Sequence, residues 1–118
     1  MRTPWSKRPA PDLPGTIVVV DPSGRQGSLV VPPGQRVLVG SDARATIRVE
    51  HPRVAPWQAG IVREGPGWLL TSLDPANPIW ILDETGRAVP VLEEIGLRSG
   101  TLLSGTTQLL LNPPAALQ

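Results

Sequence analysis

The 118-residue chain contains no cysteine, no phenylalanine and no tyrosine, and only one histidine, His51. Without cysteine, the chain can form neither a disulfide framework nor a thiolate metal site, and nothing requires an oxidising compartment. A single histidine leaves no second imidazole for a metal site and has no serine partner at the spacing of a nucleophilic triad. We therefore predict a protein that is not an enzyme and that uses no metal and no cofactor.

Strong charge of one sign and long apolar runs are also missing. Eleven basic and ten acidic side chains give a formal net charge of +1, which is too small and too scattered for a nucleic-acid-binding surface. No apolar run approaches the roughly 18 residues of a membrane span, and the basic N-terminal segment lacks the apolar region of a secretory signal. We expect a cytoplasmic protein that neither binds nucleic acid nor inserts into a membrane.

Proline, glycine and aliphatic side chains are abundant instead. The 15 prolines and 12 glycines separate short apolar runs of period two, a pattern typical of many short strands joined by turns. Tryptophan is the only large aromatic residue, so the core must be built from valine, leucine and isoleucine, which favour strands. No long segment has the period of a helix. These features predict a single all-β domain of about ten short strands.

The strands are expected in a domain spanning residues 15–112. Residues 1–14 are a proline-rich arm that we expect to be flexible, and residues 113–118 are a tail. The expected strands lie at residues 16–21, 28–31, 36–40, 45–50, 58–64, 68–73 and 79–82, at 88–92 as an edge strand or loop, and twice within 100–111 around a Ser-Gly turn. Residues 92–97 are the one candidate for a helical turn.

Seven residues stand at the junctions of these segments in a characteristic order: Gly40, Ala59, Leu73, Asn77, Leu97, Gly100 and Gly105. Their order and positions resemble the pattern of the forkhead-associated (FHA) domain. The resemblance covers about residues 34–111 and implies an FHA-like (SMAD/FHA-type) β-sandwich of two antiparallel sheets.

Most of the positions that bind phosphothreonine in that family are replaced in this chain. Ser41 stands in place of an arginine, Ala55 and Pro56 in place of Ser-Arg, and Gln58 in place of a histidine. A phosphate dianion needs charge-assisted donors, and each such hydrogen bond is worth about 1.5–3 kcal/mol. The loss of two or three of them predicts that phosphate binding is abolished, although Asn77, which holds the peptide backbone in the family, is kept.

We interpret the chain as a phosphorylation-independent protein–protein interaction module, a subunit or adaptor in a larger assembly, and expect a role in bacterial-type signalling or assembly. The partner-binding residues are expected at the loop end: Ser41, Arg44, Arg53, Ala55, Pro56, Trp57 and Asn77. A second hypothesis is a phosphothreonine reader in which Arg44 or Arg53 supplies the phosphate ligand from a new position. A third is a homo-oligomerising domain that associates through an exposed edge or an apolar face.

Several single residues have two interpretations. Trp57 is either a lid over the core or an exposed anchor for a partner. Trp68 and Trp80 lie within expected strands, so core packing is predicted for both. Asn77 either braces its own loop through Asx-type hydrogen bonds or keeps a contact to a bound peptide. His51 precedes a proline and is expected to be exposed.

Overall fold

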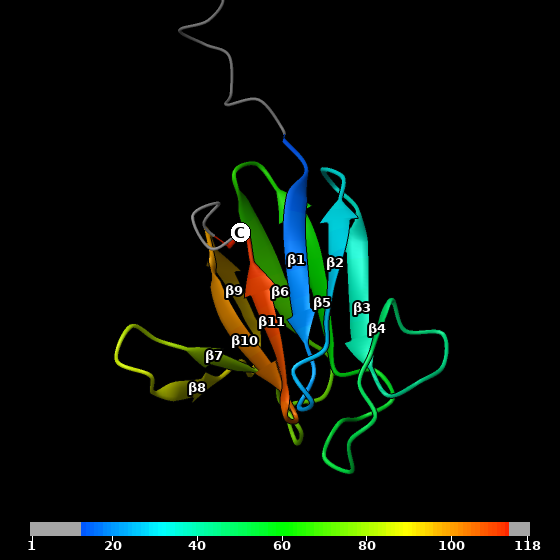
Figure 1. Cartoon of the computed structure of the whole chain (residues 1–118). Coiled ribbons are helices and arrows are strands. Elements are labelled where there is room, and N and C mark those ends of the chain that lie inside the picture. Colours follow the sequence, from blue (N-terminus) through cyan, green and yellow to red (C-terminus); the bar gives the residue numbers. More distant parts are fainter. Residues whose placement is uncertain (1–12, 114–118) are drawn as a thin grey trace, which may run out of the picture.

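The computed structural model describes residues 13–113 and folds them into eleven strands in two packed sheets (Figure 1). The prediction of an all-β sandwich is confirmed. The strands are β1 (Gly15–Val20), β2 (Gln26–Val31), β3 (Arg36–Gly40), β4 (Ile47–Arg48), β5 (Ala59–Glu64), β6 (Gly67–Ser72), β7 (Trp80–Leu82), β8 (Ala88–Pro90), β9 (Glu94–Leu97), β10 (Gly100–Ser104) and β11 (Thr107–Leu111).

One sheet has six strands in the order β2-β1-β11-β10-β7-β8, and the other has five in the order β4-β3-β5-β6-β9. Within residues 13–113, every pairing is antiparallel except that of β3 with β4, which is parallel. The predicted antiparallel pairing therefore holds in both sheets except at this edge. After β3 the chain coils through residues 41–46 and returns in the same direction, so that Val39 pairs with Ile47.

The core lies between the two sheets and is almost entirely aliphatic. Strands from both sheets contribute every second side chain to it, as the period-two pattern predicts. Its fully buried members with the largest side chains are Trp68, Ile17, Ile61, Leu70, Ile79, Leu102, Leu109 and Leu111. The prediction that Trp68 packs in the core is confirmed.

The structure corrects three sequence-based expectations. Trp80 is 38% exposed and not in the core, because Ile79 is buried on one side of it and Ile81 packs against the core on the other. Residues 92–97 form no helical turn, since β9 pairs with β6 along its whole length. The strand expected at residues 45–50 is reduced to the two residues of β4.

The proline-rich arm predicted at residues 1–14 and the tail predicted at residues 113–118 lie almost entirely outside the described residues. Leu13, near the start of the described part, is held by a hydrogen bond of 2.9 Å from Nε of Arg63 to its carbonyl oxygen. No helix in residues 13–113 is long and apolar enough to cross a membrane.

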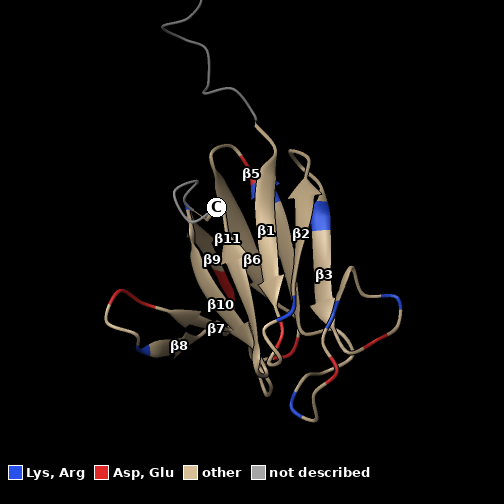
Figure 2. Ribbon diagram, in the orientation of Figure 1, with Lys and Arg blue, Asp and Glu red and all other residues tan. Residues whose placement is uncertain are grey.

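The loops that matter for function gather at one end of the sandwich. They are the β1–β2 turn, the long connection from β3 through β4 to β5, the β6–β7 loop and the β10–β11 turn, all at the lower end of Figure 1. We call this region the loop end. Figure 2 shows that charged residues lie mostly in the loops and in the five-stranded sheet.

Candidate functional site

Two loops meet directly at the loop end, one following Gly40 and the other preceding β5. The backbone N–H of Ser41 donates to the carbonyl oxygen of Ala55 over 3.0 Å, and that of Asp42 donates to Pro56 over 3.2 Å. Three of the predicted site residues, Ser41, Ala55 and Pro56, are therefore brought together. The two backbone N–H groups of the first loop already have partners within the protein.

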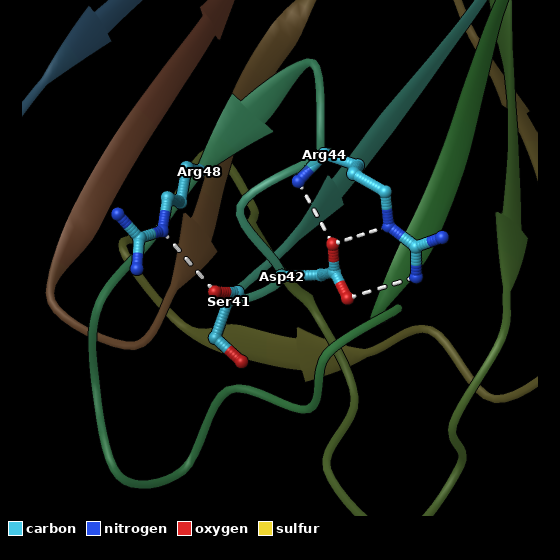
Figure 3. Close-up of polar contacts among 4 residues, drawn as sticks. All are labelled: Ser41, Asp42, Arg44 and Arg48. Atoms are coloured by element: carbon cyan, nitrogen blue, oxygen red, sulfur yellow. Dashed lines mark hydrogen bonds and ion pairs between the residues drawn. The ribbon is translucent and has the colours of Figure 1, made fainter.

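An aspartate and an arginine form a fork beside Ser41 (Figure 3). The Arg44 guanidinium donates from Nε to Oδ1 of Asp42 over 3.0 Å and from Nη2 to Oδ2 over 3.2 Å. The backbone N–H of Arg44 donates to the same Oδ1 over 2.8 Å. The side-chain hydrogen bond from Arg44, followed by its backbone N–H, lowers the pKa of Asp42 below its usual value. Asp42 is therefore an ionised carboxylate at physiological pH.

The same guanidinium covers Trp57. Its central carbon lies 5.3 Å from the centroid of the Trp57 ring, a cation–π distance. The ring is half-buried, so it is neither a fully covered lid nor an isolated exposed anchor. Arg44 and Trp57 together form one amphipathic patch on the surface of the loop end.

The other arginines of the loop end are placed differently. Arg48 donates from Nε to the carbonyl oxygen of Ser41 over 3.3 Å, as Figure 3 shows, and pairs with Glu50 over 3.2 Å. Arg53 is exposed, and no ion pair of its side chain occurs within residues 13–113. The backbone N–H of Arg53 donates to Nδ1 of His51 over 3.0 Å.

His51 is half-buried, not exposed as expected, because it packs against the β10–β11 turn. A Cβ added to Gly105 would lie 2.8 Å from Cγ of His51, so the turn approaches the imidazole closely. Gly105 also has a φ of +59°, which favours glycine. This contact joins the loop before β5 to the six-stranded sheet.

Sequence reasoning treated Gln58 only as a replacement and missed its structural role. Its side chain is 1% exposed, and Nε2 donates to the carbonyl oxygens of Asn77 and Pro78 over 3.2 and 3.3 Å. Its Oε1 accepts a hydrogen bond from the hydroxyl of Ser104. One buried amide, directly before β5, thus connects the loop before β5, the β6–β7 loop and β10. A lone glutamine opening an apolar strand was the signal in the sequence.

Asn77 is half-buried in the β6–β7 loop, and its carbonyl oxygen is one of the acceptors for Gln58. The Asx-type hydrogen bond of this loop is made by Asp74, whose Oδ1 accepts from the N–H of Ala76 over 3.1 Å. The backbone N–H of Asn77 donates to the carbonyl oxygen of Asp74 over 3.1 Å. Asp74, rather than Asn77, therefore braces the loop with its side chain.

The described residues contain no group of three or more histidine, cysteine, aspartate or glutamate side chains that could hold a metal ion. The chemistry available at the loop end consists of neutral hydrogen-bonding groups, the two arginine–carboxylate pairs, the Trp57 ring, the imidazole of His51 and further charged side chains, which are Asp21, Arg25, Arg53 and Asp74. Such a set of hydrogen-bonding groups, charges and one aromatic ring can form a binding surface.

The sequence matches no family profile and no curated protein. Solved structures are similar to it. The FHA domain of the CT664 protein from Chlamydia trachomatis superposes with a TM-score of 0.71 at 21% identity, over 87% of this chain and 100% of that one. An FHA domain studied for phosphothreonine-dependent interactions gives 0.66 at 21%, over 86% and 98%.

A third similar structure is the FhaA FHA domain in complex with the intracellular domain of Rv3910. It gives a TM-score of 0.62 at 23% identity, over 82% of this chain and 98% of that one. These likenesses show that the chain has the fold of an FHA domain, as the sequence pattern predicted.

Proposed function

We propose that the chain is a non-catalytic protein–protein interaction module that binds an unmodified protein through its loop end, without phosphorylation of the partner. We further propose that it acts in the cytoplasm as a subunit or adaptor of a larger assembly. The observation that carries the proposal concerns Ser41, which stands where the family pattern has an arginine. The residue next to it, Asp42, is an ionised carboxylate that is already paired with Arg44.

Electrostatics at this position oppose a phosphate group. A phosphate dianion at this loop would have to displace the Asp42 carboxylate from Arg44, which is already held in a two-point hydrogen-bonded pair. Arg48, beside Ser41, is likewise paired with Glu50. The N–H groups of Ser41 and Asp42 donate to carbonyl oxygens inside the protein. Pro56 has no N–H to offer. Binding a phosphate here would require these internal hydrogen bonds to break.

The remaining surface supports a partner that presents uncharged or weakly acidic groups. A half-buried tryptophan covered by an arginine is a pair of residue types enriched at interface hot spots. The adjacent Pro56 is exposed and supplies apolar area. The FhaA FHA domain was solved with a protein domain as its partner, and we extend that type of partner to this chain.

A phosphothreonine reader is the second candidate, and the exposure of Arg53 favours it. This guanidinium lies in the same loop as Ala55 and is in no ion pair within the described part of the chain. Arg44 suits the role less, because a phosphate would have to replace the Asp42 carboxylate as its partner.

Amide NMR titrations of the labelled chain test the proposal, using one pooled peptide library in phosphothreonine and unmodified forms. We expect the phosphorylated pool to bind no better than the unmodified pool. Selective shifts around Arg53 with the phosphorylated pool, abolished by Arg53→Ala but not by the matched change Arg87→Ala in the β7–β8 turn, would replace the proposal with the phosphothreonine reader.

Binding of the partner is tested with Trp57→Ala. A protein captured by the wild-type chain should be lost with Trp57→Ala and retained with Trp80→Ala, which removes the exposed tryptophan of β7. Equal retention by both variants would show that the loop end is not the binding surface.

A further inference from the structure

The six-stranded sheet carries no charged residue in any of its strands. Not one lysine, arginine, aspartate or glutamate occurs in β1, β2, β7, β8, β10 or β11. In Figure 2 these strands are tan apart from the blue end of the β8 ribbon, where Arg87 of the β7–β8 turn precedes the strand, and the other charged residues next to them lie in turns. Charged residues are expected to be absent from the side of a sheet that packs on the core, but the side that faces solvent usually carries polar and charged residues.

The solvent-facing side of this sheet is defined by strand register. Ile17, Leu102 and Leu109 point into the core, so their neighbours along each strand point outward. We call these outward residues the outer face: Thr16, Val18, Val20, Gln26, Ser28, Val30, Trp80, Leu82, Ala88, Pro90, Thr101, Leu103, Gln108 and Leu110.

Nine of the fourteen residues of the outer face are apolar, and all nine are at least partly accessible. Val30 is 63% exposed and Trp80 38% exposed, at opposite sides of the sheet. Between them lie the half-buried aliphatic side chains of Val18, Leu103 and Leu110. An apolar surface of this kind on a soluble domain marks an interaction site, and depletion of charge is the compositional sign of an interface core.

The five-stranded sheet, on the opposite side of the sandwich, does carry charged residues on its solvent-facing side. The outward positions of the five-stranded sheet include Arg36, Arg48, Glu64 and Glu94, which are all exposed. A solvent-facing side with charged residues is therefore compatible with this fold. The fold alone therefore does not explain why the outer face of the six-stranded sheet lacks charged residues.

We propose that the outer face is an interface between two copies of this chain. In a two-fold dimer the same patch meets itself, so any charged residue near the axis would approach its own copy. A face without charge avoids that repulsion. It also lacks the charge pattern by which a foreign partner would be steered and selected. Two such faces can stack as sheets, about 10 Å apart.

The size of the outer face sets the expected strength of the dimer. Six strands spaced about 4.8 Å apart, each with about five residues rising about 3.3 Å, cover roughly 450 Å². Two copies would thus bury on the order of 900 Å², just below the roughly 1,000 Å² expected of a specific interface and in the range of weak, transient ones. A weak dimer that forms in the micromolar range or above is expected. This inference does not depend on the function proposed for the loop end.

Sedimentation equilibrium of the full chain over a wide concentration range tests this inference. We expect the apparent mass to rise with concentration from 12.6 kDa toward twice that value. Val18→Lys and Leu110→Lys should each hold the mass at that of one copy. The matched change Val62→Lys, at a half-buried outward position of the other sheet, should dimerise like the wild type.

Dispersed amide spectra identify the variants that remain folded, and Val18→Lys decides if Leu110→Lys does not fold. A wild-type mass of one copy at every concentration overturns the inference. So does a dimer that both folded outer-face variants form as well as the wild type, or one that Val62→Lys alone disrupts. Dilution-dependent amide shifts should map to β1, β10 and β11, and shifts confined to the loop end would also contradict it.

Discussion

The carbonyl oxygen of Pro56 occupies the space in which a side chain at position 40 would begin. A Cβ on Gly40 would lie 1.9 Å from that oxygen and 2.6 Å from the carbonyl carbon of Pro56. The contact lets the loop after β3 and the loop before β5 share backbone hydrogen bonds. Glycine is therefore required at position 40, because the two loop backbones approach too closely to leave room for a side chain.

Gly40→Ala should destabilise the domain by more than about 2 kcal/mol, because the obstruction is backbone rather than a flexible side chain. Gly27→Ala is the control, since a Cβ at this strand position meets nothing within 4 Å, and it should change stability by less than about 1 kcal/mol. Urea denaturation measures both. Equal stability of the two variants would show that the loops separate at little cost.

Gln58→Leu should cost about 2–4 kcal/mol, because it leaves the Ser104 hydroxyl and two loop carbonyl oxygens without their partner in a buried site. Ser104→Ala should cost less. In a double-mutant cycle the two changes should be coupled by about 1 kcal/mol, measured by urea denaturation. Gln35→Leu, in the exposed β2–β3 turn, is the control for the loss of an amide. Additive effects would contradict the buried hydrogen bond.

The fold was predictable because its determinants are local and periodic. Alternating aliphatic residues predicted the strands, and turn residues such as Gly105 predicted their ends. Gly40 and Gly105 are two of the positions that match the family pattern, and the structure explains both, since each lets another loop approach closely. Trp80 was misplaced because an aromatic residue in a strand was assigned to the core without regard to the side on which it falls.

The site was less predictable, because its chemistry depends on pairs that are set by loop conformation. The sequence offered Arg44 as a free cation, whereas the loop curls so that Asp42 accepts three hydrogen bonds from it. Gln58 shows the reverse case. The sequence indicated only that it replaces a histidine of the family pattern, whereas its buried side chain hydrogen-bonds to the β6–β7 loop and to β10.

Asp42 should titrate at a lower pH than an ordinary aspartate, because hydrogen bonds from Arg44 favour its ionised form. Its pKa is depressed in the folded state, so the pair stabilises the fold above the unfolded pKa of about 3.9, and this contribution is lost as the pH falls through the folded value. Carboxyl-carbon NMR of the labelled protein should show this midpoint.

Arg44→Gln should raise the Asp42 midpoint and leave that of Asp83 unchanged. The pKa of Asp83 is lowered in the β7–β8 turn by the side-chain hydrogen bond from Thr85, followed by the backbone N–H of Arg87. Both carboxylates are on the surface, so Asp83 serves as an internal control for effects of salt and net charge. An unchanged midpoint for Asp42 would show that the Arg44 fork does not persist in solution.

Arg63 should be sensitive even to substitution by lysine. Its side chain is 4% exposed, its Nε and Nη1 donate to the carbonyl oxygens of Leu13 and Gly67 over 2.9 and 3.2 Å, and its guanidinium lies 4.9 Å from the centre of the Trp68 ring. A lysine ammonium lacks the planar fork and the stacking surface, so Arg63→Lys should cost about 1–3 kcal/mol in urea denaturation. Arg36→Lys, at an exposed position of β3, should stay within about 0.5 kcal/mol. If both substitutions have the same small effect, the buried guanidinium does not hold the start of β1 against β5 and β6.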